Sequence, residues 1–313
     1  MRETPGKALR KLLGRKQTLV KPGAYNALSA MIIEKAGFPC CGVTGYGVSA
    51  ALLGKPDVGL LTLDEIVTAT RYITRAVKIP VIADADTGFG NAINVMRTVE
   101  EFIAAGAAAI HIEDQVAPKR CGHIAGKQVV PLEEMAGKIR AADKVRRDLD
   151  PDFVLIARCD ARGVAGGSVD DLVRRANAYL EAGADLAFVE GPTSVEEIRR
   201  VCREVHGPIF YNQTGLSPRL TPAEMADLGV AVTILPGAML RVGLQALWDF
   251  AAALRQEGPA AEARFAERFK GHPVGDLHTF AGFDRIRAWE EAYLPAEELD
   301  KYEGSVGHQP TRT

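Results

Sequence analysis

One stretch of the sequence changes abruptly from apolar to reactive residues, and it holds the strongest candidate for chemistry. Residues 107–110 form an apolar run, and residues 111–123 then bring acids, bases, a proline, a cysteine, a glycine and a histidine. Cys121 lies between two cations and a Gly-His pair, an electropositive setting that favours a thiolate or an easily transferred proton. Single cysteines are often small packing residues, but these neighbours are too polar for a core. We therefore expect Cys121 to be reactive.

The two histidines of this stretch and the other cysteines have less specific patterns. His123 either orients Cys121 or faces water, whereas His111 precedes the end of the apolar run and is typical of a hydrogen-bonded core histidine. Three further cysteines lie in apolar or helical contexts and are expected to be inert packing residues: Cys40, Cys41 and Cys202. The five cysteines have no metal-finger spacing, which suits a reducing compartment and predicts a cytoplasmic protein.

Apolar runs that predict buried strands alternate with helical periodicity along most of the chain. The runs lack polar alternation, as expected for a parallel sheet with both faces covered. The eight predicted strands are residues 18–23, 40–44, 80–86, 107–110, 153–158, 186–190, 208–212 and 230–235. The main predicted helices are residues 26–36, 62–77, 95–105, 133–147, 169–182, 195–205 and 238–256, with a short helix after Thr221.

This alternation predicts an α/β fold, a closed (β/α)₈ TIM barrel preceded by a short amphipathic helix over residues 9–13. Glycines at 37, 106, 183 and 229 stand where helices would end in the left-handed conformation, which supports the repeat. A doubly wound open sheet is the alternative, weakened because no Gly-x-Gly-x-x-Gly follows the first strand. Residues 45–47 read as a glycine-rich loop after the second strand.

The barrel domain is expected to cover residues 1–258, followed by a C-terminal helical extension and tail over residues 259–313. Within the extension, residues 260–269 and 277–293 have a helical pattern, and the last twenty residues read as a loose polar segment.

A net charge of −2 and a pI of about 6.3 favour neither nucleic acid nor an anionic membrane as a binding partner. Apolar runs fall short of the roughly 20 residues of a membrane helix, and no signal core follows the polar N-terminus.

Acidic residues gather where the predicted strands end, which in a barrel is the side of the active site. Asp84 and Asp86 alternate by two, so both are predicted to point to one side of their strand. The other polar strand ends supply Glu113, Asp114, Arg158, Asp160, Glu190 and Asn212. Carboxylates that converge in one place need positive charge among them. Oxygen ligands without a His-Cys cluster favour a hard cation, Mg²⁺ first and Mn²⁺ as the alternative.

Each of these residues also has a purely structural interpretation. Asp114 or Asp160 could serve only to cap the next helix. Arg158 could pair with a neighbouring acid, and Glu190 and Asn212 could be hydrogen-bonding supports. The set as a whole nevertheless favours binding of a metal and an anion, because these side chains come from several successive strand ends.

With these residues in place, the chain resembles the isocitrate lyase/phosphoenolpyruvate mutase superfamily over about residues 18–245. The motifs that carry the resemblance are residues 22–25, 53–59, 84–90, 111–115 and, as the lyase signature, 119–123. The cysteine in the signature points to the carbon–carbon lyase branch, which includes 2-methylisocitrate lyase and 2,3-dimethylmalate lyase. The carboxyphosphonoenolpyruvate mutases stay open as a phosphonate branch.

The resemblance implies roles for individual residues. It implies that Asp86 holds Mg²⁺ directly, while Asp84, Asp57 and Glu113 act through bound water. The backbone of residues Thr44, Gly45 and Tyr46 would receive the carboxylate of a pyruvate-like half of the substrate. Arg158 would meet the oxygen where negative charge develops, Glu190 and Asn212 would support or contact the substrate, and the Cys121 loop would close over it.

The implied reaction is a retro-aldol-type cleavage of a 2-hydroxy di- or tricarboxylate to a 2-oxo acid such as pyruvate and a short carboxylic acid. Mg²⁺ would lower the pKa of the substrate hydroxyl, and Cys121 would protonate the carbanion as general acid. Oxaloacetate hydrolysis or decarboxylation, and phosphonate rearrangement, are the alternatives on the same scaffold. A non-catalytic metabolite-binding barrel is disfavoured by the complete set of acids.

Two departures from the 2-methylisocitrate lyase pattern lie where the outer groups of the substrate should sit. Residues 212–218 form a shorter segment than is typical there and carry no acid, and Tyr46 replaces a small residue. Both changes favour a smaller or less charged substrate, such as a methyl-substituted malate. The resemblance further implies a homotetramer in which the last barrel helix is exchanged between subunits.

Overall fold

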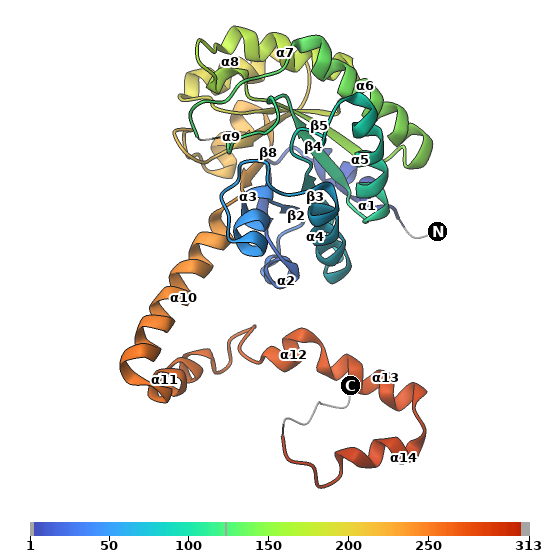
Figure 1. Ribbon diagram of the computed structural model, residues 1–313, viewed down its shortest axis with the longest axis vertical. Coiled ribbons are helices and arrows are strands. Elements are labelled where there is room, and N and C mark those ends of the chain that lie inside the picture. Colours follow the sequence, from blue (N-terminus) through green and yellow to red (C-terminus); the bar gives the residue numbers. More distant parts are fainter. Residues whose placement is uncertain (1–2, 123, 308–313) are drawn as a thin grey trace. The chain divides into compact units, whose positions relative to one another are not determined.

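The computed structural model describes residues 3–122 and 124–307, and the chain divides into two compact units, Met1–Val242 and Gly243–Thr313 (Figure 1). The first unit contains the barrel. The predicted division into a catalytic domain over residues 1–258 and an extension over residues 259–313 stays a prediction. No helix in the described part of the chain combines the length and the apolar character that a bilayer crossing requires.

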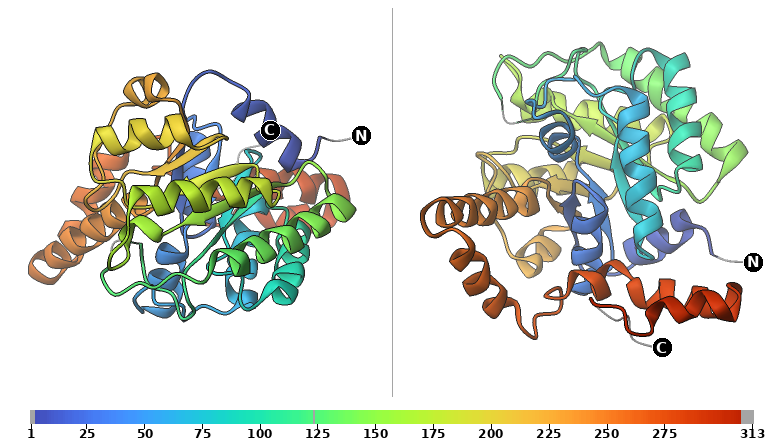
Figure 2. Two further views of the ribbon diagram at one scale, coloured as in Figure 1. Left: turned by 90° about the horizontal axis from the view of Figure 1, so that it is seen from above. Right: turned by 60° about the horizontal axis from the view of Figure 1, so that its bottom comes forward.

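Eight parallel strands form a closed barrel in sequence order, with β1 hydrogen-bonded to β8, so the predicted (β/α)₈ barrel is confirmed. The strands are β1 (Leu19–Ala24), β2 (Cys41–Val43), β3 (Val81–Asp84), β4 (Ala109–Glu113), β5 (Val154–Cys159), β6 (Leu186–Val189), β7 (Ile209–Asn212) and β8 (Val230–Leu235). They are buried on both faces because helices surround them, which explains their unbroken apolar runs (Figure 2).

The helices of the first unit follow the predicted order. They are α1 (Pro5–Leu13), α2 (Ala27–Lys35), α3 (Gly45–Val48), α4 (Leu63–Ala76), α5 (Ala92–Ala104), α6 (Leu132–Leu149), α7 (Val169–Glu181), α8 (Val195–Glu204) and α9 (Pro222–Leu228), with a 3₁₀ turn, η2 (Ala161–Gly163). The four glycines predicted to end helices all have positive φ. Thr62 and Glu65 form a capping box at the start of α4.

The segment after β2 is helical, not the glycine-rich loop that the sequence suggested. It contains α3 and the π-helix η1 (Ser49–Leu53). The Thr44 hydroxyl accepts a hydrogen bond from the Gly47 amide and so caps α3. A side chain at Gly47 would place its Cβ 2.7 Å from Thr44 and 2.9 Å from Tyr25. This glycine therefore allows close packing rather than flexibility.

The second unit contains most of α10 (Ala238–Glu257), which begins in the first unit, and then α11 (Pro259–Phe269), α12 (Leu277–Ala281), α13 (Phe283–Tyr293), α14 (Ala296–Leu299) and the 3₁₀ turn η3 (Asp300–Tyr302). The predicted helix over residues 277–293 is interrupted at Gly282, whose φ of 98° ends α12. Part of the predicted loose tail is ordered as α14 and η3. The Arg287 guanidinium lies 3.8 Å from the centre of the Tyr302 ring, which ties η3 to α13.

Asp114, directly after β4, fixes the start of the loop that carries Cys121. Its side chain is fully buried and accepts hydrogen bonds from the Tyr179 hydroxyl and the Asp160 amide, both at 2.8 Å. The two ends of the loop meet through a bridge between Gln115 and Val129. Asp114 thus fixes the loop base and does not cap a helix.

We expect Asp114→Ala to lower the free energy of unfolding by about 3–5 kcal/mol, because it leaves buried donors without an acceptor. Tyr179→Phe removes one of these bonds and should cost about 1–2 kcal/mol. Urea denaturation measures both. The exposed Asp148→Ala is the matched control and should change stability by less than about 0.5 kcal/mol. A similar loss for Asp148→Ala and Asp114→Ala would contradict the role of Asp114.

Candidate active site

A cavity of about 320 Å³ opens at the carboxyl ends of the barrel strands. Seven of the residues predicted for the site line it: Thr44, Tyr46, Asp57, Asp84, Cys121, Arg158 and Asn212. The remaining predicted residues within the described chain contact these. His123 lies outside the described residues. The strand-end pattern in the sequence therefore brings together residues that are up to 168 positions apart in the chain.

Asp84 ends β3 and organises the backbone on its side of the cavity. Its carboxylate accepts hydrogen bonds from the amides of Gly45 and Asp86, each at 3.0 Å. Burial acts to raise the pKa of Asp84, but nearby positive charge and the Asp86 amide outweigh it, so its pKa lies well below the ordinary value. Asp84 is therefore a carboxylate, and it shapes the start of α3.

The expectation that Asp84 and Asp86 project from one side of a strand is wrong. The strand ends at Asp84, and Asp86 has a φ of 46°, in the left-handed region. The hydrogen bond from the Asp86 amide to the Asp84 side chain turns the chain there. Asp86 still reaches the cavity region, because this turn directs it toward Lys119.

Lys119 is the residue whose role the sequence did not reveal. It is 4% exposed, and its ammonium lies 2.6 Å from Asp57 Oδ1 and 2.9 Å from Asp86 Oδ1. Burial acts to lower the pKa of Lys119, but the surrounding carboxylates raise it well above the ordinary value. Burial, with Asp84 and Asp57 nearby, raises the pKa of Asp86 to about 6 against the opposing effect of Lys119. The Asp57–Asp86 pair thus holds a cation between its carboxylates.

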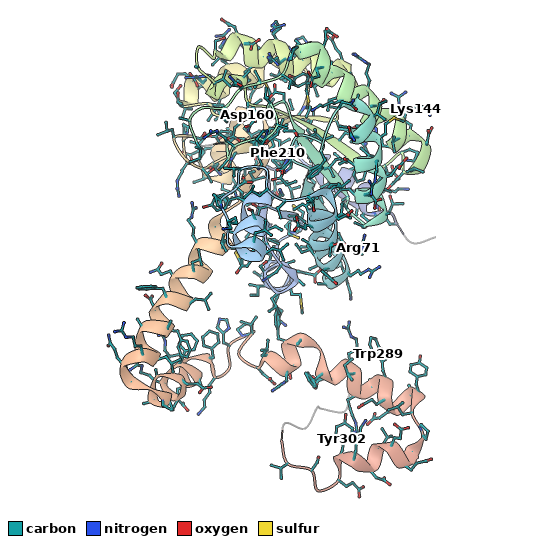
Figure 3. All side chains as sticks on the ribbon, viewed as in Figure 1. Arg71, Lys144, Asp160, Phe210, Trp289 and Tyr302 are labelled. Carbon is teal, nitrogen blue, oxygen red and sulfur yellow. The ribbon has the colours of Figure 1, made fainter. Side chains whose placement is uncertain are left out.

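A second cluster of charges centres on Arg158 at the end of β5. Its guanidinium lies 2.8 Å from Asp160, 3.3 Å from Glu113 and 3.6 Å from Glu190. Asp160, labelled in Figure 3, also accepts a hydrogen bond from Lys127 at 2.9 Å. Despite burial, these two cations hold the pKa of Asp160 down to about 2. Asp160 therefore fixes Arg158 and the Cys121 loop, and it makes no helix-capping bond.

Glu113, at the end of β4, and Glu190, directly after β6, lie beside Arg158, and Asn212, at the end of β7, lies next to Glu190. Burial raises the pKa of Glu113 well above its ordinary value, and Glu113 Oε1 is buried without a hydrogen-bond partner. The Asn212 side-chain amide donates to Glu190 at 3.2 Å. Asn212 accepts in turn from the Thr214 hydroxyl at 2.8 Å. These contacts fix the orientation of Glu190 and Asn212.

Cys121 is half-buried and lies on a loop that several backbone contacts hold over the cavity. Its amide donates to the Asp57 carbonyl at 3.1 Å. The Gln115 side chain accepts from the amide of Arg120 and donates to its carbonyl. Gly122 lies against the Arg158 cluster, since a Cβ there would be 2.3 Å from Arg158 Nη2. Glycine at this position therefore permits the loop to approach the cluster.

His111 is buried in the barrel, as predicted, but it also lines the cavity. Its Nδ1 lies 3.6 Å from Asp84 Oδ1, beyond hydrogen-bond distance, and has no hydrogen-bond partner. Burial lowers the pKa of His111 to about 3, more than Asp84 can raise it, so the imidazole is neutral at neutral pH. The expectation of a hydrogen-bonded histidine is thus not met at this nitrogen. Its ring instead packs edge-on against Phe188.

Within residues 3–122 and 124–307, no three Asp, Glu, His or Cys side chains converge closely enough to form a complete metal site. Mg²⁺ does not require one, because it keeps several waters and binds through one or two carboxylates plus the substrate. The Glu113 oxygen that lacks a hydrogen bond, and the ammonium held between Asp57 and Asp86, show carboxylates that accept a cation. The donor set is compatible with a hard divalent ion.

Comparison with known proteins identifies the same family that the sequence motifs resemble. The phosphoenolpyruvate phosphomutase family model matches residues 9–255. A 2,3-dimethylmalate lyase from Eubacterium barkeri is 47% identical over 287 residues, 91% of this chain and 96% of that protein. A 2-methylisocitrate lyase from Aeropyrum pernix is 46% identical and covers 78% of each chain. These relatives confirm the prediction that the protein is an enzyme of the carbon–carbon lyase class.

Three solved structures share the fold. A 2,3-dimethylmalate lyase, described as a member of the PEP mutase/isocitrate lyase superfamily, has a TM-score of 0.85 at 33% identity and covers 98% of this chain and all of that one. An oxaloacetate acetylhydrolase has a TM-score of 0.84 at 33% identity, and the match covers 92% of this chain and 97% of that one. A phosphonopyruvate hydrolase solved with oxalate and Mg²⁺ has a TM-score of 0.83 at 35% identity, and the match covers 94% of this chain and all of that one. The chain therefore belongs to the isocitrate lyase/phosphoenolpyruvate mutase superfamily.

Proposed function

We propose that the protein is a Mg²⁺-dependent lyase that cleaves a 2-hydroxy di- or tricarboxylate, of the 2,3-dimethylmalate or 2-methylisocitrate type, to pyruvate and a short carboxylic acid. The observation that carries this proposal is that the Cys121 thiol lines the same cavity as Asp84 and Arg158. A proton donor, carboxylates for a metal and a fixed cation are the groups that such a cleavage needs. The lyase names of the relatives support the same reaction class.

The metal would be held mainly by Asp86, with Asp84, Asp57 and Glu113 acting through bound water. When bound, Mg²⁺ lowers the pKa of a substrate hydroxyl and stabilises negative charge on oxygen. Mn²⁺ is the alternative with the same oxygen preference. The Mg²⁺ in the similar phosphonopyruvate hydrolase supports this choice.

The substrate's 2-oxo-acid half would lie against the start of α3. The amides of Thr44 and Gly45 already donate to Ala24 O and to Asp84. A carboxylate would therefore meet the amide of Tyr46, because the first N–H groups of a helix have no acceptor within that helix. Asn212 would contact the substrate from the end of β7.

Arg158 and Cys121 would act on the charge that develops during cleavage. Transfer of the hydroxyl proton to water would break the adjacent carbon–carbon bond, form the C=O of the 2-oxo acid and leave the electron pair on the carbon next to a carboxylate. Arg158, held by Asp160 and Glu113, presents a fixed donor fork to the resulting enediolate. The Cys121 thiol then gives its proton to that carbon. His123 would orient the thiol, and Glu190 would keep Arg158 in place.

A panel of candidate substrates tests the reaction. We expect 2,3-dimethylmalate or 2-methylisocitrate to be cleaved to pyruvate, detected by NMR of the products, and EDTA to abolish turnover until Mg²⁺ is restored. Oxaloacetate and phosphonopyruvate are included as the alternative substrates. Turnover of either one, with no hydroxy acid cleaved, would replace the lyase proposal by hydrolysis or phosphonate rearrangement.

Replacing the thiol tests the proton donor. Cys121→Ser should lower kcat by about 10²- to 10⁴-fold, since a hydroxyl is a much weaker acid. The melting temperature and Mg²⁺ binding should stay as in the wild type. Cys202→Ser, on α8, is the matched control and should leave turnover unchanged. Near-normal turnover of Cys121→Ser would remove this thiol from the mechanism.

We also propose that the protein is a cytoplasmic homotetramer that exchanges α10 between subunits. The part of α10 beyond Val242 exposes large apolar side chains, with Trp248 75% exposed and Leu247 67% exposed in the isolated chain. Exposed apolar surface of this kind is typical of subunit interfaces.

Light scattering tests this assembly. The wild-type protein should have the mass of four chains, and Trp248→Glu should shift it toward smaller species by placing charge in the interface. Tyr72→Glu, on α4, is a control for added surface charge. A wild-type monomer would contradict the proposal.

A further inference from the structure

Lys21, in the middle of β1, is a buried lysine that the proposed mechanism does not use. It is 3% exposed and lines the cavity together with Asp84 and Arg158. Leu19, two residues earlier on the same face of β1, belongs to the apolar cluster inside the barrel. Lys21 therefore lies where that apolar interior ends and the cavity begins, on the cavity floor.

The neighbouring strand makes room for the Lys21 side chain. A Cβ at Gly42, on β2, would lie 1.5 Å from Lys21 Cε and 2.2 Å from Nζ. Any other residue at position 42 would displace the lysine. The absence of a side chain on Gly42 thus allows the Lys21 stem to extend across the barrel interior. The ammonium lies 5.6 Å from the centre of the Phe210 ring, which belongs to β7 and is labelled in Figure 3.

Lys21 differs from the other buried cations at this end of the barrel. Lys119, Lys127 and Arg158 each have a carboxylate oxygen within 2.9 Å. Within the described parts of the chain, no hydrogen bond or ion pair involves the Lys21 ammonium. Burial lowers its pKa to about 8, against the attraction of Asp84, so the group is mostly charged at neutral pH. A buried charge of this kind is costly unless something pairs with it.

The neighbours of Lys21 do not supply that partner. The oxygens of Asp84 already accept the amides of Gly45 and Asp86. His111, which also lines the cavity, carries no carboxylate, and its ring packs edge-on against Phe188. The counter-ion of the Lys21 ammonium must therefore be part of a ligand that enters the cavity, and a small anion has the charge required.

We propose that Lys21 is a substrate-binding residue whose ammonium pairs with a carboxylate of the bound substrate on the cavity floor. This rests on the proposed function in one respect, that the substrate is a carboxylic acid. The ammonium is a compact point charge with three donors, so it selects for negative charge at that point rather than for a planar shape. Lys21 thus favours a substrate with a full carboxylate there over an amide or ester.

Binding of two small probes in the presence of Mg²⁺ tests the proposal without any turnover. Oxalate carries two carboxylates, and oxamate replaces one of them by a neutral amide. By calorimetry, wild-type protein should bind oxalate more tightly than oxamate. Lys21→Met should weaken oxalate binding by about 10- to 100-fold and reduce the preference over oxamate. Lys21→Met should also raise KM for the substrate more than it lowers kcat.

Two controls separate binding from folding and from net charge. Lys21→Met should melt at the wild-type temperature or above it, because it removes a buried charge that has no protein partner. Lys21→Gln serves as the second variant if the methionine variant does not fold. Lys35→Met removes one exposed charge from α2 and should leave both affinities unchanged.

Two results would overturn the proposal: wild-type protein that does not distinguish oxalate from oxamate, or a Lys21 variant that binds oxalate as the wild type does. Neither probe contains the hydroxy-acid bond that the lyase is proposed to break. A failure of the cleavage assay would therefore leave the Lys21 result intact, and loss of the Lys21 effect would leave the cleavage assay intact.

Discussion

The barrel mouth depends on neutralising carboxylates that are buried close together. Asp57, Asp84, Asp86, Glu113, Asp160 and Glu190 come from five neighbouring parts of the barrel, and each of them is buried or nearly so. Carboxylates in such a site lose solvation and repel one another. The fold remains stable because cations lie among them at ion-pair distance.

The cations come from two sources. Arg158 lies on β5 and has acidic neighbours at the carboxyl ends of both adjacent strands, Glu113 at the end of β4 and Glu190 directly after β6. Lys119 and Lys127 come from the loop after β4 and reach separate carboxylates. The loop therefore completes the electrostatics of the barrel as well as carrying the thiol. Lys21 stands apart, since its charge is left for a ligand.

Much of this could be predicted from the sequence. Continuous apolar runs and helix-ending glycines gave the eight strands in order, and the strand-end rule placed Asp84, Glu113 and Arg158 at one site. These features follow from local pattern and from the general geometry of parallel barrels.

The remaining features depend on contacts between residues far apart in the chain. The partners of Lys119 are fixed by how the loop folds back, and no local pattern records that. The turn at Asp86 follows from a side-chain hydrogen bond that interrupts the strand, so the period-two argument failed there. The position of the Lys21 side chain could not be predicted from the sequence, because the space at Gly42 that admits it comes from a different strand.

The short bridge between Gln115 and Val129 has a consequence for how this region can move. It joins the two ends of the loop, while Lys119 and the Cys121 amide hold the loop to Asp57 and Lys127 holds it to Asp160. Lys119 and Cys121 are two positions apart on this loop. A movement of the loop that took the Cys121 thiol away from the cavity would also take the Lys119 ammonium away from Asp57 and Asp86. The position of the proton donor and the neutralisation of these two carboxylates are therefore coupled.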